Sequence, residues 1–252
     1  MGCYSGCPCL MTHCQNSVKT MKALVILNMG ALAVWLASTS VYATGMVPET
    51  SVVIVEEDDG EGVINIKNTD AFPVLLLTNI INIKEDSEAL LVVTPPAARV
   101  EPGKTQRVRF LLAHKEPLKT ERLKRVLFDG VPPQQKGQNQ VRMSVRQNLP
   151  VILRPSGLER DTAPWKRLVW SLDANTLTVH NPSPYVVRLG QDLLTLPDNT
   201  PWMLPASYIL PGQTLAIKPG ADKTVSSARQ VRISPATTWG YTVNSYDADL
   251  AQ

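Results

Sequence analysis

From residue 44 onward, the sequence is a series of short apolar segments in which no helical repeat persists. Alternation is clear in 98–113, where Val108 and Phe110 fall on one side and Arg107 and Arg109 on the other. The chain has more prolines (20) than glycines (14), which favours proline-containing turns between the segments. Apolar segments at a spacing of roughly ten residues predict an all-β fold.

The predicted strands form two groups with a polar junction between them. The first group ends with "QVRMSVRQNLPVILRP" at 140–155, and the junction is "RPSGLERDTAPW" at 154–165. About seven short strands with turns between them are typical of an immunoglobulin-like sandwich. We therefore expect two such β-sandwich domains, at 44–155 and 156–252.

A leader segment precedes the first domain. Residues 21–43, "MKALVILNMGALAVWLASTSVYA", contain a lysine, an apolar run and a small-x-small site that ends at Ala43. This order is that of a cleavable secretory signal, so we expect the mature chain to start near Thr44. The alternative is a retained membrane anchor, but the apolar run is short for a bilayer span.

Residues 1–20 carry all the cysteines of the chain. The cysteines crowd around His13, which allows a small metal-binding or redox tag. However, no second pair of ligands follows at the spacing of a zinc finger. Because a signal peptide should be N-terminal, we favour the interpretation that residues 1–20 are upstream sequence and that translation starts at Met21. The exported chain would then be free of disulfides. The four cysteines are Cys3, Cys7, Cys9 and Cys14.

The sequence after residue 43 offers no set of catalytic residues. It has two histidines, His114 and His180, no cysteine and no G-x-S-x-G motif. The acidic run at 56–61 lacks the ligand order of a calcium loop, and "EPGKT" at 101–105 lacks that of a phosphate loop. A net charge of +3 without a basic patch argues against nucleic acid. We therefore expect a binding protein with no enzymatic activity, cofactor, metal or small-molecule substrate.

One strand has the features of a sheet edge that needs a partner. Val141, Met143 and Val145 share one side of an extended segment, and Pro150, which a central strand should not tolerate, follows them. An apolar edge strand without a partner is an aggregation hazard. The alternative is that the three residues are ordinary core residues of the first sandwich.

Four motifs resemble those of the periplasmic, PapD-like pilus-assembly chaperones of the chaperone–usher pathway. They occur in the family's order and spacing, through nearly the whole chain after the leader. The motifs are "TPPAARVEPGKTQRVRF" at 94–110, "GVPP" at 130–133, "LPVILRP" at 149–155 and "HNPSPYVV" at 180–187.

The resemblance implies two immunoglobulin-like domains in an L or boomerang arrangement, and a periplasmic chaperone function. Such a chaperone binds, folds and caps pilin subunits that lack their last strand, then delivers them to an outer-membrane usher. It lends the subunit its own strand, here with Val141, Met143 and Val145 as the donated row. The resemblance also allows a self-capping homodimer when no subunit is bound. The alternative function is a secreted two-domain structural pilus component or adhesin.

The chain departs from the family in the residues that anchor the subunit's terminal carboxylate. The family uses an arginine on the first strand and a lysine shortly before its R-P motif, but Pro150 stands at the lysine position and no arginine occurs between Thr44 and Val63. Other groups must then take this role. The candidates are Arg146, Lys124, Arg125, Thr50 and Ser51.

The arginine of the R-P motif is Arg154. In the family this residue joins a buried ion pair between the domains, and Glu121 and Asp247 are the expected partners by position. We expect these residues to set the angle between the domains rather than to bind the subunit.

Overall fold

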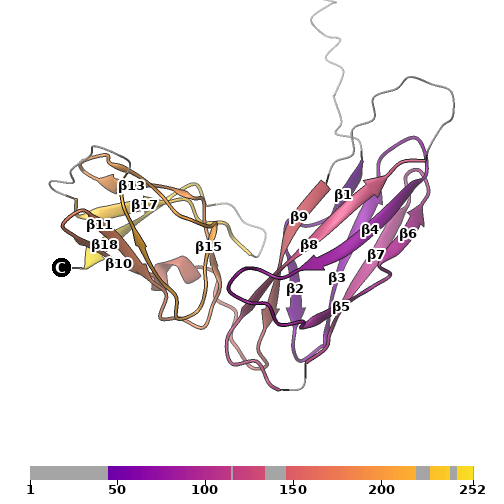
Figure 1. Cartoon of the computed structure of the whole chain (residues 1–252), viewed down its shortest axis with the longest axis horizontal. Helices are drawn as coiled ribbons and strands as arrows, with labels where there is room; N and C mark the ends of the chain where they lie inside the picture. The colour runs from indigo at the N-terminus through magenta and orange to yellow at the C-terminus, as the bar shows by residue number, and fades with distance from the viewer. Residues whose placement is uncertain (1–44, 115, 134–145, 220–227, 239–242, 252) are drawn as a thin grey trace, which may run out of the picture. The chain divides into compact units, whose positions relative to one another are not determined.

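A computed structural model of the 252-residue chain describes residues 45–114, 116–133, 146–219, 228–238 and 243–251 (Figure 1). Nearly every regular element in these ranges is a β-strand, with one short 3₁₀ helix, η1 (Pro164–Arg167), in the junction. The strands form two sandwich-like domains, which confirms the predicted all-β class. The angle between the domains stays a prediction.

The first domain contains strands β1 to β9 in one continuous sheet path. Its order is β5-β7-β3-β2-β9-β8-β4-β6, and β1 pairs with β3. β2 and β9 run parallel, whereas the other neighbours are antiparallel. The strands are β1 (Met46–Pro48), β2 (Val53–Glu56), β3 (Glu61–Asn68), β4 (Val74–Ile81), β5 (Leu91–Thr94), β6 (Ala97–Val100), β7 (Thr105–Leu112), β8 (Arg122–Val131) and β9 (Arg146–Arg154).

The core of the first domain follows from the period-two patterns of its strands. Ile64 on β3 and Val108 and Phe110 on β7 pack in one apolar cluster with Val126 and Phe128 on β8, and all five are fully buried. Successive residues of a strand point to opposite faces, so the intervening polar residues reach solvent. The alternation that the sequence predicts for Val108 and Phe110 is confirmed.

Gly62 allows β3 to lie close to β2. A Cβ atom at this position would lie 2.3 Å from the carbonyl oxygen of Ile54, a distance that no side chain can occupy. Glycine is therefore required for the two strands to meet at the start of β3.

The second domain contains strands β10 to β18. Seven of them form a sheet of order β14-β13-β17-β18-β10-β11-β16, and β12 pairs with β15. Its core is built around Trp165, Trp170 and Trp202. The strands are β10 (Val169–Asp173), β11 (Thr176–His180), β12 (Val187–Arg188), β13 (Asp192–Leu196), β14 (Pro201–Met203), β15 (Tyr208–Ile209), β16 (Thr214–Ile217), β17 (Gln230–Ile233) and β18 (Tyr246–Ala251).

The expectations for the leader fall outside the described residues, since the described part of the chain begins at Gly45. Within that part, no helix is long and apolar enough to cross a membrane. The same residues contain no group of three His, Cys, Asp or Glu side chains placed to hold a metal ion.

Candidate functional site: the open edge of β9 and its surroundings

Strand β9 has two halves with different neighbours. From Val151 to Arg154 it lies between β8 and β2 and pairs with both. From Arg146 to Pro150 it pairs with β8 alone among the described strands. Within the part of the chain that the structure describes, the backbone on the other side of this first half is therefore a free edge, and such an edge is a template for pairing with another chain.

The expected donor residues lie immediately before this edge. Val141, Met143 and Val145 are outside the described residues, so their role stays a prediction. In the described half of the strand, Leu149 packs against the core of the first domain, whereas Arg146 and Asn148 are exposed.

Two of the anchor candidates are engaged by carboxylates of the chain itself. Arg146 Nε lies 2.6 Å from Asp129 Oδ1, directly across the β8–β9 ladder. Lys124 is fully buried, and its Nζ lies 2.8 Å from Asp86 Oδ1. The proposal of Lys124 as an anchor is therefore corrected: its ammonium is inside the domain and cannot reach a bound chain.

Asp86 is the centre of this charge cluster, in which Lys124 is fully buried and Arg122 is partly exposed. Its carboxylate also accepts from Arg122 Nη2 at 2.6 Å and Arg122 Nε at 2.7 Å. Burial alone would raise the pKa of Asp86, but the hydrogen bonds from Arg122 and Lys124 outweigh it and lower the pKa to about 2. Arg122 also pairs with Glu88, so the two cations of the cluster face two carboxylates of the same domain, and the cluster is structural.

Arg125 differs from these two cations because no carboxylate of the described residues pairs with it. Its Nε donates to Asn148 Oδ1 at 2.6 Å and its Nη2 to the Asn148 carbonyl oxygen at 2.8 Å. Burial lowers the pKa of its guanidinium. Arg125 lies directly opposite Pro150 in the ladder, at the inner end of the free edge.

The two hydroxyl candidates precede β2. Thr50 and Ser51 are exposed, and Thr50 Oγ1 donates to the Val52 carbonyl oxygen at 2.9 Å. Their role in binding a carboxylate stays a prediction.

Arg154 forms a buried ion pair with Glu121, as the sequence suggests. Arg154 Nε lies 3.1 Å from Glu121 Oε1, and its Nη1 lies 2.9 Å from Glu56 Oε1. The other oxygen of Glu121 accepts from the backbone N–H of Val186 in the second domain at 2.8 Å. Burial raises the pKa of Glu121, and the hydrogen bonds from Val186 and Arg154 counteract that effect.

The expectation that Asp247 pairs with Arg154 is corrected. Both oxygens of Asp247 accept from Arg232, each at 2.7 Å. These residues are direct cross-strand neighbours on β17 and β18, so the nearer cation pairs with Asp247. Glu56 provides the second carboxylate of Arg154, because parallel pairing of β2 with β9 places the two residues opposite each other.

An apolar cluster that the sequence analysis missed continues from the Arg154–Glu121 pair. Leu123 on β8 and Ile152 on β9 pack with Val52, Ile83 and Val186. Tyr208 and Leu210 pack against the same cluster. The outward positions of β8 and β9 next to the ion pair are thus apolar and covered, whereas those farther along, from Arg125 to Asp129, are partly exposed.

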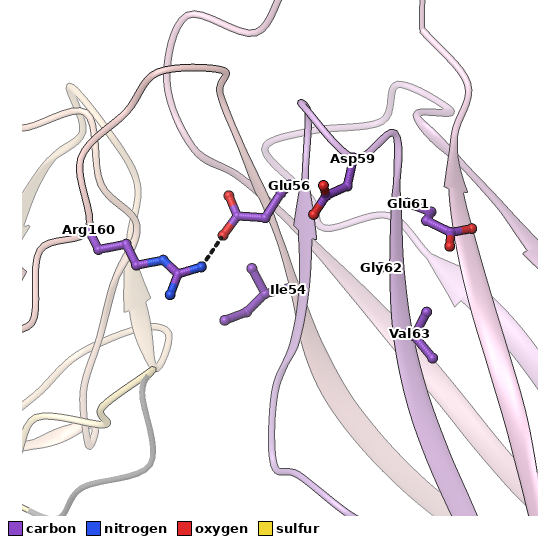
Figure 2. Close-up of a pocket in the computed structure, with 7 residues that line it drawn as sticks. All are labelled: Ile54, Glu56, Asp59, Glu61, Gly62, Val63 and Arg160. Atoms are coloured by element: carbon purple, nitrogen blue, oxygen red, sulfur yellow. Dashed lines mark hydrogen bonds and ion pairs between the residues drawn. The ribbon is translucent and has the colours of Figure 1, made fainter.

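The acidic run at 56–61 borders a surface pocket of about 500 Å³ (Figure 2). Figure 2 shows Arg160 pointing toward Glu56, and the two groups lie 3.5 Å apart. Glu61 pairs with Arg109. Arginines thus pair with Glu56 and Glu61, whereas Asp59 has no ion pair with another described residue. The lining residues are Ile54, Glu56, Asp59, Glu61, Gly62, Val63 and Arg160.

The described residues form two sandwich domains, and the first contains a strand that pairs on one side only along half of its length. Comparisons with known proteins show the family to which this chain belongs. The family model "Pili and flagellar-assembly chaperone, PapD N-terminal domain" matches residues 45–159, and "Pili assembly chaperone PapD, C-terminal domain" matches residues 163–246. The fimbrial chaperone YhcA of Escherichia coli (strain K12), described as uncharacterized, is 42% identical over 216 residues, which cover 84% of this chain and 94% of that protein.

Solved structures of chaperones share the fold. The CupB2 chaperone of Pseudomonas aeruginosa matches with a TM-score of 0.65 and 23% identity, over 81% of this chain and 100% of that one. The Salmonella enterica SafB chaperone, solved in complex with the SafA pilin, matches with a TM-score of 0.66 and 20% identity, over 84% and 99% of the chains. This chain belongs to the PapD-like family and is a chaperone of chaperone–usher pilus assembly. That assignment sets aside the alternative of an adhesin or structural pilus component.

Proposed function

We propose that this chaperone captures a fimbrial subunit by strand addition along β9. The observation that carries the proposal is the free edge from Arg146 to Pro150, which has a described partner on one side only. A subunit that lacks one strand of its own sandwich can pair its backbone with this edge. The pairing satisfies the unpaired groups of both chains.

The apolar row at 141–145 supplies the side chains of the contact. Val141, Met143 and Val145 directly precede the described part of this strand in the sequence. Burying each of these side chains in the open groove of a subunit contributes roughly 1.5–3 kcal/mol. The apolar row therefore provides affinity for an apolar groove, and the backbone pairing fixes the register between β9 and the subunit.

The wider role follows the family. Residues 21–43 direct export to the periplasm, and cleavage leaves a mature chain that starts near Thr44. The chaperone holds its subunit there and transfers it to an outer-membrane usher. It does so without an enzymatic step, since capping exchanges one set of noncovalent contacts for another.

Co-expression with a pilus subunit from the same gene cluster tests the proposal. Met143→Asp places a carboxylate in the proposed contact, and we expect the yield of periplasmic chaperone–subunit complex to fall at least about tenfold, since burying an unpaired charge is costly. Met203→Asp is the matched control, because Met203 is an exposed methionine on β14 of the second domain. Equal yields from wild type and Met143→Asp would show that the row is not the contact.

A further inference from the structure

The backbone groups of β9 alternate between its two sides. In an antiparallel ladder, every second residue exchanges hydrogen bonds with the partner strand, and the residues between them turn their N–H and carbonyl groups away from it. Pro150 lies opposite Arg125 and has no N–H to exchange, so the residues of its parity point away from β8. The N–H of Glu57, just after β2, donates to the carbonyl oxygen of Arg154 at 3.0 Å, which agrees with this direction.

Two features restrict the inner end of the free edge. The described residues that point their backbone groups to the free side are Arg146, Asn148 and Pro150. Pro150 offers an acceptor but no donor. The carbonyl oxygen of Asn148 already accepts from Arg125 Nη2 at 2.8 Å. Arg146 lies outside both restrictions, so the edge is more open at its start than beside β2.

The side chain of Arg125 is held in this position by a second bond. Its Nε donates to Asn148 Oδ1 at 2.6 Å, so one guanidinium binds the side chain and the backbone of the same residue. Two donors of one planar group fix its orientation as well as its position. Because the Asn148 carbonyl points away from β8, the side chain of Arg125 extends from β8 across β9 to the free side.

We propose that Arg125 is a gatekeeper of the free edge: it covers the Asn148 carbonyl in the unloaded chaperone and is displaced when a subunit strand pairs as far as Asn148. This inference rests on the proposed function. Charged side chains and prolines protect sheet edges from unwanted pairing, and Arg125 and Pro150 are such a pair. The role is the opposite of an anchor, since loss of Arg125 strengthens pairing.

Displacement of Arg125 makes the chaperone selective. Every strand that pairs at Asn148 has to break the same two hydrogen bonds, whatever its sequence. A strand from a subunit whose groove buries the apolar row at 141–145 regains this cost, whereas a strand without such a groove does not. The gatekeeper therefore weakens incorrect partners more effectively than correct ones, which is how an interface gains specificity.

Competition for a limiting amount of one subunit tests the gatekeeper. Wild type and one variant are co-expressed with the tagged pilus subunit of the same gene cluster, and mass spectrometry measures the share of each chaperone in the purified complexes. Each share is divided by the amount of that folded chaperone in the periplasm. Arg125→Thr removes the gatekeeper, and Asn148→Ala removes its side-chain acceptor but keeps the charge of Arg125. We expect each variant to be enriched about threefold or more over wild type.

The direction of the change separates the gatekeeper from other roles of Arg125, because an anchor or a purely structural residue would lower capture when it is removed. Arg107→Thr, the same change at an exposed arginine of β7, is the matched control and should compete equally with wild type. Equal or reduced capture by Arg125→Thr or by Asn148→Ala would overturn the gatekeeper. If Met143→Asp abolishes capture in that case, strand addition stands and the gatekeeper alone fails. Capture by Met143→Asp at the wild-type level would remove both.

Discussion

Arg154 Nε lies 3.1 Å from Glu121 Oε1, and both side chains are buried. Glu121 also accepts from the N–H of Val186, so one carboxylate joins strand β9 of the first domain to the backbone of the second. The ion pair is therefore part of the contact between the domains as well as of the first sandwich.

Removing Arg154 should be strongly destabilising. In Arg154→Ala, Glu121 stays buried without its cation, and we expect the free energy of unfolding to fall by about 3–5 kcal/mol at neutral pH. Denaturant unfolding followed by fluorescence measures it. The loss should shrink as pH falls toward the ordinary pKa of glutamate, because a protonated Glu121 needs no cation. Arg232→Ala, which removes an exposed pair with Asp247, should cost less than about 1 kcal/mol.

Asp86 makes the stability of the first domain sensitive to acid. Its pKa is lowered from 3.8 to about 2 in the folded chain, so its contribution is fully present above about pH 4 and is lost as pH falls toward 2. We expect Asp86→Asn to be less stable than wild type at neutral pH, because buried Lys124 loses its carboxylate. Urea midpoints across this range should converge near pH 2. A constant gap between the two proteins would contradict this assignment.

Asn181 should be essential for the second domain. Its Nδ2 donates to the carbonyl oxygens of Tyr185 and Ile209, and its Oδ1 accepts from the backbone and hydroxyl of Ser183. In Asn181→Ala, these buried groups lose their partner, at an expected cost on the order of 3 kcal/mol in unfolding free energy. Gln230→Ala, which removes an exposed bond to Asp249, is the control and should be nearly neutral. Equal effects of the two substitutions would refute the structural role of Asn181.

Local patterns of the sequence predicted most of the strands, because alternation depends only on neighbouring residues. Val108 and Phe110 were placed in the core correctly for this reason. The partners of Arg154 could not be predicted from such local patterns. Glu56 became its partner through parallel pairing of β2 with β9, and Asp247 was taken by Arg232 through the β17–β18 register. Strand register joins distant segments, and the single sequence carries no local signal for it.

The candidate site was likewise predictable only in part from the sequence. Pro150 and the apolar row indicated an edge strand, and the free edge of the described half of β9 supports that interpretation. Lys124 was misjudged because its position in a basic stretch gives no sign that Asp86 holds it inside the domain.

Processing of the leader can be checked on the exported protein. We expect the chain recovered from the periplasm to begin at Thr44, since the signal peptide ends at the small-x-small site of residues 41–43. Intact-mass measurement and N-terminal sequencing identify the first residue. Replacing Ala43 by Arg should block cleavage and leave a longer chain in the membrane fraction. A periplasmic chain that retains residues 21–43 would contradict the prediction.

Residue-resolved amide exchange on β9, in the free chaperone and in its complex with a subunit, tests strand addition most directly. Alternate amides between Arg146 and Leu149 that point away from β8 should exchange at least about tenfold more slowly in the complex, because they gain partners on the subunit. Amides of β17, which pairs with β13 and β18 on its two sides, should not change. Unchanged exchange along β9 in a complex that remains bound would contradict the account.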